Sequence, residues 1–410
     1  MRILNVTQSY EPFFEFGGPP AKVPALSEGL AKFGHEVTVL TADWGLDKRL
    51  GNEPGAEPAE DSPFGRRRRK SGVTAIYLAN WLHFRAMSWN PALPRYLRAR
   101  LGSFDIVHIF GLYDILGARV AVACRLQGIP YVVEPMGMFL PIVRNIKMKR
   151  LYHRLWGRRM LADANVVIAT ADQERSELIS GGIPAEKIVL RRNGVDGPAL
   201  LPSYGTFRDS LQIPGDVKLI LFLGRLSLKK SPELLLEAFA KLIPLEHRTS
   251  DSPHLVFVGP DESGMLEMLK EMSVKLLLTD RVHFVGPISG QAKWAAYRDA
   301  DIFALPSQNE NFGNSAAEAI AAETPVIVTE QCGIAPLVAG TAGLVAKHDV
   351  VSLCDALRLL LQDEELYRTL KEGCRTTMRR LGWAEPLEQM NTLFGRIARS
   401  RKGSAIGIES

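Results

Sequence analysis

The chain has 410 residues, 46% of them hydrophobic, which is long enough for two globular domains and too apolar for a disordered protein. Its four cysteines form no C-x-x-C pair, which argues against a zinc site or a disulfide framework and fits a reducing compartment. The N-terminal apolar run is too short for a signal peptide, and no window approaches the roughly 18 apolar residues of a membrane span. We therefore expect a cytoplasmic protein.

The net charge of +5 is unevenly placed along the chain. No acidic residue occurs between positions 62 and 104, a stretch that includes the basic run 66–70, and a second acid-free stretch separates Glu134 from Asp163. Such a basic first half fits anionic lipid, nucleic acid or an anionic substrate, although it can also serve only solubility. Because no aromatic residues accompany the run in a reading motif, we expect no specific nucleic acid partner.

The first half alternates between strand and helix patterns. Residues 2–7 predict a buried strand, which is followed by a loop containing Gly17 and Gly18, a helix over 21–33 and a strand over 36–41. This order forms one parallel crossover unit. Paired glycines let backbone amides approach a phosphate, although a plain turn uses them equally well.

Further patterns follow up to position 190. Residues 43–71 lack an apolar period and predict a long mobile loop. Strand patterns occur at 73–77, 106–110, 131–133, 165–169 and 188–190, with a helix over 115–127. Apolar residues at helical spacing over 148–156 lie within the second basic stretch and suit an anionic lipid surface. We favour the alternative that this stripe packs on its own domain, because the period is short.

The second half begins after a Gly- and Pro-rich segment, 198–215, that predicts a linker. Strand patterns at 218–223, 255–258, 282–285, 302–305 and 326–328 alternate with helix patterns at 232–243, 264–278, 291–299 and 314–323. This alternation predicts a parallel sheet covered on both faces. The fold class is therefore α/β, with two Rossmann-like domains, 1–197 and 216–382, and a terminal helix, 383–410, returning toward the first.

Two cations follow the first strand of the second half. Arg225 and Lys230 come after Gly224, at the carboxyl end of a central strand, where doubly wound sheets bind ligands. Positive charge there would stabilise the negative charge of a departing diphosphate. The alternative is two surface cations on a loop.

Two glutamates, Glu310 and Glu318, lie eight positions apart after a later strand of the same sheet. The backbone amides of 312–315 start a helix and form a natural seat for a diphosphate. Glu318 can accept both hydroxyls of a ribose, and Glu310 can accept a sugar hydroxyl. Read alone, Glu318 is an acid stabilised by the helix dipole, and Glu310 is a solvated loop acid. A nearby pair, Asp299 and Asp301, lies at a helix-to-strand junction and predicts capping rather than a metal site.

Together these motifs resemble the retaining glycosyltransferases of family 4, also called glycosyl transferases group 1, which have the GT-B fold. The resemblance covers most of the chain and is strongest from 224 to 328, a range that includes 224–230 and the two glutamates. The segment 192–196 and the N-terminal glycine pair also resemble the family. It implies two domains facing across a cleft, the first binding the acceptor and the second the donor. It also implies the following donor-binding residues: Gly17, Gly18, Arg225, Lys230, Glu310, Asn311, Phe312, Gly313, Asn314 and Glu318. No metal or cofactor is implied.

The chain departs from the family pattern at two positions. Ser231 replaces the glycine that usually follows Lys230, and Met136 stands where many relatives carry a histidine close to the reacting sugar. His108, at the end of a strand pattern, is the nearest alternative catalytic group, although a lone histidine there is more often structural. We therefore assign catalysis to Glu310, Arg225, Lys230 and His108. In one retaining scheme the departing phosphate accepts the acceptor proton, and no histidine is needed.

The sequence thus predicts a retaining hexosyltransferase that uses a nucleotide-sugar donor of the UDP or GDP type. The acceptor would be a saccharide or a lipid-linked saccharide in polysaccharide or glycolipid biosynthesis, and the basic first half would lie on the anionic inner face of a membrane. Two alternatives stay open. One is a nucleotide-sugar epimerase or hydrolase of the same fold, and the other is a non-catalytic donor-binding subunit.

Overall fold

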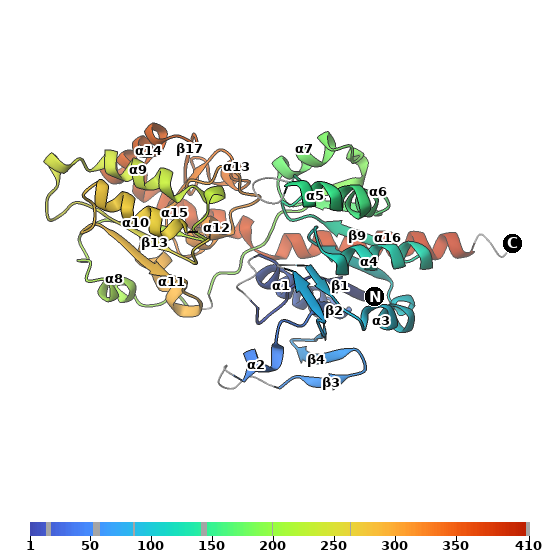
Figure 1. Ribbon diagram of the computed structural model, residues 1–410. Helices are drawn as coiled ribbons and strands as arrows, with labels where there is room; N and C mark the ends of the chain where they lie inside the picture. The colour runs from blue at the N-terminus through green and yellow to red at the C-terminus, as the bar shows by residue number, and fades with distance from the viewer. Residues whose placement is uncertain are drawn as a thin grey trace. The chain divides into compact units, whose positions relative to one another are not determined.

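A computed structural model describes residues 1–13, 18–51, 58–84, 87–140, 146–198, 200–262 and 264–406. The chain divides into two compact units (Figure 1). Unit 1 comprises Met1–Arg192 and Trp383–Ser410, and unit 2 comprises Asn193–Gly382. Each unit is built around its own parallel sheet, which confirms the predicted fold class. The segment predicted as a linker lies in unit 2 and contains the short helix α8 (Thr206–Ser210).

Unit 1 contains a nine-stranded sheet in the order β11-β10-β9-β8-β1-β2-β5-β4-β3. Its strands are β1 (Arg2–Val6), β2 (Glu36–Ala42), β3 (Glu60–Ser62), β4 (Gly65–Lys70), β5 (Val73–Leu78), β8 (Ile106–Phe110), β9 (Tyr131–Glu134), β10 (Val166–Ala169) and β11 (Ile188–Leu190). Pairing is parallel from β11 to β5 and antiparallel for β3 and β4. A separate two-stranded hairpin is formed by β6 (Leu82–Phe84) and β7 (Met87–Trp89).

Helices cover both faces of this sheet because successive strand residues point to opposite sides. The helices are α1 (Gly18–Lys32), α2 (Leu46–Leu50), α3 (Leu93–Arg100), α4 (Ile115–Gln127), α5 (Ile146–Tyr152), the π-helical turn η3 (His153–Gly157), α6 (Arg158–Ala162), α7 (Asp172–Ser180) and α16 (Ala384–Ile406). On β1, Leu4 and Val6 belong to one apolar core with residues of α4, whereas Ile3 belongs to another with α1 and α16.

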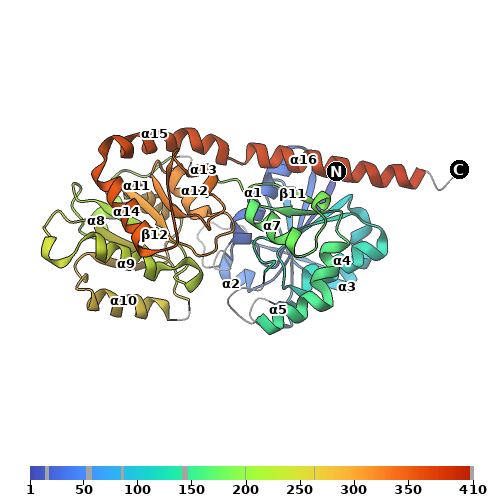
Figure 2. The ribbon, with the colours of Figure 1, turned by 90° about the horizontal axis from the view of Figure 1, so that it is seen from above.

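The terminal helix α16 packs against α1, and Figure 2 shows the two side by side. Gly29 of α1 makes this contact close, since a β-carbon there would lie 2.4 Å from a methyl group of Leu387. The ring Nε2 of His35 lies 2.8 Å from Oδ1 of Asn391. None of the described helices is long and apolar enough to cross a membrane.

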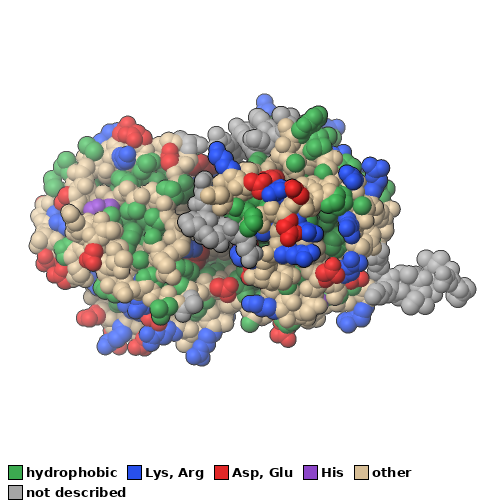
Figure 3. Space-filling view, turned by 90° about the horizontal axis from the view of Figure 1, so that it is seen from below, with side chains coloured by type: hydrophobic (Ala, Val, Ile, Leu, Met, Phe, Trp, Pro, Cys, Tyr) green, Lys and Arg blue, Asp and Glu red, His purple; other side chains and the backbone are tan. Residues whose placement is uncertain are grey.

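The segment 43–71, predicted as a mobile loop, instead contains α2, β3 and β4 where the structure describes it. The basic run forms β4, which pairs with β5 along its whole length. Arg66 pairs with Asp47 and Asp61, and Arg67 donates to Glu60 at 2.5 Å. These ion pairs join the strands, so the segment lacks the apolar alternation by which a strand is predicted from sequence. On the face shown in Figure 3, acidic side chains accordingly lie among the lysines and arginines of unit 1.

The basic stretch around 146–162 also differs from expectation. Tyr152, Met160 and Leu161 are buried, as packing on the same domain requires. The remaining apolar residues are between 40% and 54% exposed, namely Ile146, Met148, Leu151, Leu155 and Trp156. The predicted packing is therefore wrong for most of the 148–156 stripe, because Tyr152 is its one apolar side chain that faces the core.

Unit 2 contains a six-stranded, fully parallel sheet in the order β14-β13-β12-β15-β16-β17. Its strands are β12 (Leu219–Leu223), β13 (His254–Val258), β14 (Val282–Gly286), β15 (Ile302–Leu305), β16 (Val326–Thr329) and β17 (Gly343–Ala346). Its longer helices are α9 (Pro232–Leu242), α10 (Met265–Lys275), α11 (Gly290–Asp299), α12 (Asn314–Ala321), α14 (Val350–Gln362) and α15 (Glu364–Leu381), with a single turn at α13 (Ala335–Val338). The strand order reverses between β12 and β15, and ligands of such sheets bind at this switch point.

The pair Asp299 and Asp301 has the predicted capping role. Asp299 accepts the backbone amides of Gly205 at 2.7 Å and of Phe207 at 2.6 Å and so caps α8. Asp301 accepts a hydrogen bond from the buried Arg208 at 2.6 Å. Both carboxylates thus fix the segment that leads into β12.

Candidate functional site

Three polar segments meet at the carboxyl edge of the unit 2 sheet, on either side of the switch point. They are the turn after β12, the loop after β15 and the loop after β16. Backbone hydrogen bonds tie them together, from the amide of Gln308 to the carbonyl of Lys229 at 3.1 Å, from Glu310 to Gln331 at 3.1 Å and from Gly333 to Glu310 at 2.9 Å. The loops therefore form a fixed frame rather than independent surface segments.

The predicted cation Lys230 and the predicted acid Glu310 meet in this frame. The Nζ atom of Lys230 lies 2.6 Å from Oε2 of Glu310, and the two side chains are only 21% and 19% exposed. Burial raises the pKa of Glu310, but the ammonium of Lys230 outweighs it and brings that pKa below its ordinary value. Arg225 is half exposed, 3.7 Å from Glu262, and contributes to the same lowering.

Two glycines allow the Lys230 turn to lie against the strand ends. Gly259, which follows β13, has a φ of +142°, and a β-carbon there would lie only 1.9 Å from the carbonyl oxygen of Gly224. At Gly224 a β-carbon would lie 3.2 Å from Cδ of Lys230. The Lys230 side chain therefore passes close to Gly224, where a β-carbon would make a tight contact with it.

Ser231 accounts for one departure from the family pattern. Its backbone adopts the left-handed conformation, with φ +47° and ψ +50°, which glycine adopts without strain. Its hydroxyl lies 2.9 Å from Nε2 of His348 and donates to the carbonyl of Leu228 at 3.2 Å. These two contacts compensate for a strained backbone directly after Lys230.

The start of α12 forms the other side of the site. Gly313 has a φ of +103° and precedes the helix, which begins at Asn314, so the first amides of the helix have no partner within it. Phe312 is buried in the core of unit 2, and its side chain therefore does not face a ligand. Only its backbone amide fits the predicted binding role. Asn311 precedes these residues in the same loop.

Glu318 lies in the second turn of α12 and is 22% exposed. Its Oε1 atom is 2.7 Å from Nζ of Lys293, and its Oε2 atom accepts a hydrogen bond from the Tyr297 hydroxyl at 2.9 Å. Sequence reasoning did not find these two partners. Their spacing of four positions on α11 places them on one helix face, but only the packing of α11 on α12 brings that face to Glu318.

The predicted residues of unit 1 give a different result. His108 is fully buried in β8, its ring centre 3.8 Å from that of Phe110 and its Nε2 atom 3.4 Å from Oε2 of Glu134. Burial, with Arg191 and Lys22 nearby, lowers its pKa well below the ordinary value. A side chain without accessible surface cannot reach an acceptor hydroxyl, so its burial gives no support to the catalytic assignment of His108, which stays a prediction.

Charged residues of unit 1 form a buried cluster at the carboxyl end of β9. Glu134, at the end of β9, pairs with Lys22 of α1 and with Arg191. The half-buried Met136 follows in a left-handed turn, with φ +58°. Of the glycine pair, Gly18 begins α1, and Gly17 lies outside the described residues.

Comparisons with known sequences agree with this geometry. Residues 204–377 match the profile described as glycosyl transferases group 1, and residues 17–194 match a glycosyl transferase 4-like domain. The chain is 31% identical over 310 residues to a D-inositol 3-phosphate glycosyltransferase of Corynebacterium urealyticum, which covers 71% of each chain. It is 33% identical over 268 residues to the protein of that name from Kineococcus radiotolerans, spanning 60% of this chain and 61% of the relative.

Solved structures show the same architecture. A sucrose-phosphate synthase from Thermosynechococcus elongatus superimposes with a TM-score of 0.75 at 22% identity, covering 97% of this chain and 99% of the other. HepE from Anabaena, solved in complex with UDP and glucose, gives a TM-score of 0.73 at 18% identity, covering 97% and 100%. At these identities the likeness concerns the fold alone.

Proposed function

The chain belongs to the glycosyl transferases group 1 family and has the GT-B fold, and from this premise we propose that it transfers a sugar from a nucleotide-sugar to an acceptor hydroxyl. The observation that carries the proposal is the meeting of Lys230, Glu310 and the α12 N-terminus at the switch point of unit 2. Arg225 and Glu318 lie on the same edge. The donor would be a hexose nucleotide of the UDP or GDP type.

Each group has a defined task in this reaction. The ammonium of Lys230, the guanidinium of Arg225 and the first amides of α12 stabilise the diphosphate as it departs. Glu310 bonds a hydroxyl of the donor sugar, and Glu318 bonds the ribose. Lys230 divides its hydrogen bonds between Glu310 and a phosphate oxygen, since an ammonium has three donors. The same ion pair therefore links sugar recognition to leaving-group stabilisation.

The reaction needs no cofactor, because one bond breaks, one bond forms and the proton that is released has an acceptor. The bond from the anomeric carbon to the donor phosphate oxygen breaks, and a bond from that carbon to the acceptor oxygen forms on the same face of the ring. The acceptor proton moves to the departing phosphate. This route gives retention of configuration and requires no side chain as base, which is consistent with the complete burial of His108.

Turnover assays test this proposal. Nucleotide-sugars of both base types are incubated with the protein, alone and with inositol phosphate, oligosaccharide and lipid-linked saccharide acceptors. We expect nucleoside diphosphate release that depends on an acceptor, with a product whose anomeric proton coupling matches that of the donor. Release or epimerisation without acceptor would instead identify a hydrolase or epimerase, and tight donor binding with no turnover would identify a binding subunit.

We further propose that unit 1 docks on an anionic membrane surface, so that the acceptor is a lipid-linked saccharide used in glycolipid or polysaccharide biosynthesis. The exposed apolar residues of α5 and η3 support this, because they alternate with cations such as Lys147 and Arg154, the composition of an interfacial helix. Trp156, 43% exposed, adds an aromatic ring of the kind found at membrane interfaces.

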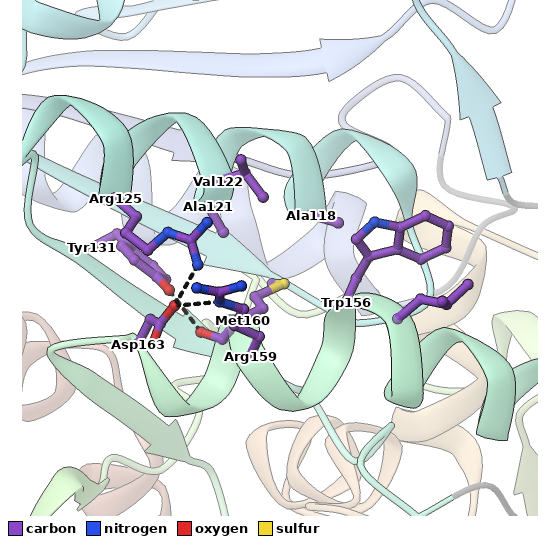
Figure 4. A pocket seen from close by; sticks show the side chains of 10 residues that line it. Ala118, Ala121, Val122, Arg125, Tyr131, Trp156, Arg159, Met160 and Asp163 are labelled. Carbon is purple, nitrogen blue, oxygen red and sulfur yellow. Dashed lines mark hydrogen bonds and ion pairs between the residues drawn. The ribbon is translucent and has the colours of Figure 1, made fainter.

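A shallow pocket adjoins this surface between α4 and α6 (Figure 4). Its apolar side is lined by Val122, Leu155 and Trp156, and its polar end is formed by Asp163 with Arg125 at 3.1 Å and Arg159 at 3.4 Å. Cations at the edge of an apolar surface suit an anionic headgroup above an acyl layer.

Vesicle binding tests the membrane proposal. We expect sedimentation with phosphatidylglycerol vesicles that weakens at high salt, and weak sedimentation with phosphatidylcholine vesicles. Replacing Leu151 and Leu155 by glutamine should abolish the binding. Replacing Leu359, which is 45% exposed in unit 2, should leave it unchanged. Equal binding to both vesicle types would contradict the proposal.

A further inference from the structure

The carboxylate of Glu318 is held by two side chains from a neighbouring helix. Lys293 and Tyr297 lie one turn apart on α11, and each contacts a different oxygen of Glu318, at 2.7 Å and 2.9 Å. A carboxylate has about four lone-pair directions, two on each oxygen. The two contacts therefore occupy one direction on each oxygen and leave one on each for a ligand.

Tyr297 is rigidly placed for this contact. Its side chain is fully buried, with its ring centre 5.6 Å from that of Phe303 and 5.9 Å from that of Trp294. Its backbone carbonyl accepts a hydrogen bond from the Thr324 hydroxyl at 2.6 Å. Burial and then Glu318 itself raise the pKa of Tyr297 well above the ordinary value, so the phenol stays protonated and donates to the carboxylate.

Lys293 contributes charge as well as position. Its Nζ lies 5.1 Å from the ring centre of Trp294, and its side chain is 25% exposed. A carboxylate near a bound diphosphate would repel it, and the adjacent ammonium offsets this repulsion. The pair is thus compatible with an anionic ligand on the same edge of the sheet.

We propose that Lys293 and Tyr297 are positioning residues that hold Glu318 with one free lone pair on each oxygen, aimed at the two hydroxyls of the donor ribose. This inference rests on the proposed function, since it requires a ribonucleotide donor. Two vicinal hydroxyls match two fixed acceptors, whereas an unrestrained glutamate would have to be ordered during binding.

The readout is the preference for ribose over deoxyribose, measured by titration calorimetry. UDP and GDP are titrated first, and the diphosphate that binds is compared with its 2′-deoxy form. Hydrogen bonds to a charged group predict at least a tenfold preference for the ribose form in the unchanged protein. Y297F should reduce this preference threefold or more with little change in affinity for the deoxy form, and K293M should reduce it as well.

Y204F is the matched control, because Tyr204 lies in the same unit and is 57% exposed. It should leave the preference unchanged. An unchanged preference in both Y297F and K293M, or an equal loss of affinity for both nucleotides, would overturn the inference while the proposed function stands. If the unchanged protein binds neither UDP nor GDP, the proposed function itself fails and the inference fails with it.

Discussion

Replacement of Lys230 by methionine tests the site most sharply, because it removes one charge and preserves the length of the side chain. A hydrogen bond from an ammonium to a phosphate contributes about 1.5–3 kcal/mol, so the affinity for a nucleoside diphosphate should fall about 10- to 150-fold. The same change leaves Glu310 without its partner at 2.6 Å. Since both side chains are about one-fifth exposed, we expect a loss of about 1 kcal/mol in stability, which lowers the Tm by about 2–4 °C.

Calorimetric titration with UDP and GDP measures the first effect, and thermal unfolding measures the second. Lys229→Met is the matched control, because it removes a neighbouring charge in the same turn and spares the contact with Glu310. We expect it to change affinity less than threefold. An affinity of Lys230→Met within twofold of the unchanged protein would refute the assignment of Lys230 to the diphosphate.

Three further predictions concern stability. Gly259→Ala should destabilise unit 2 by more than about 3 kcal/mol, seen as a large fall in Tm, because the added carbon would lie 1.9 Å from a carbonyl oxygen. The free energy of unfolding of Ser231→Gly should stay within about 1 kcal/mol of that of the unchanged protein, because relief of backbone strain offsets the lost bond to His348. Ser231→Ala keeps the strain and loses the bond, so denaturant titrations should show a loss of about 1–2 kcal/mol. Burial lowers the pKa of His254 to about 4 in the folded protein, so between pH 6.5 and 4 the unfolded chain binds more protons at this residue than the folded one. The free energy of unfolding should therefore fall as the pH is lowered from 6.5 to 4. Unfolding scans of His254→Asn should show a smaller fall.

Much of the fold was predictable because strand and helix periods are local properties of the chain. The crossover units and five of the six strands of unit 2 near their predicted positions follow from apolar period and glycine stops, whereas β17 was not predicted. The hairpin of β3 and β4 could not be predicted this way. Its strands bury few side chains and are held by ion pairs such as Arg67 to Glu60, which have no periodic signal.

The position of a site residue was predictable where that residue directly follows the end of a strand. It was not predictable where the packing of distant elements decides whether a side chain is buried or which side chains it contacts. The carboxyl ends of parallel strands share one edge, so the meeting of Lys230 and Glu310 follows from topology. His108 also occupies a strand, but the depth of a side chain depends on what covers it, and here Phe394 of the distant α16 packs 5.8 Å from its ring centre. The contacts of Lys293 and Tyr297 with Glu318 likewise depend on how α11 packs against α12.

The central claim is that unit 2 binds a nucleotide-sugar through Lys230, Glu310 and Glu318. A thermal-shift screen of the full chain against UDP, GDP and their hexose derivatives tests it most directly. At a hundredfold excess over the dissociation constant, a true ligand adds about 2.7 kcal/mol, and we predict a rise in Tm of several degrees that Lys230→Met combined with Glu318→Ala abolishes. No rise with any of these nucleotides at millimolar concentration, or an equal rise in the double variant, would contradict the claim.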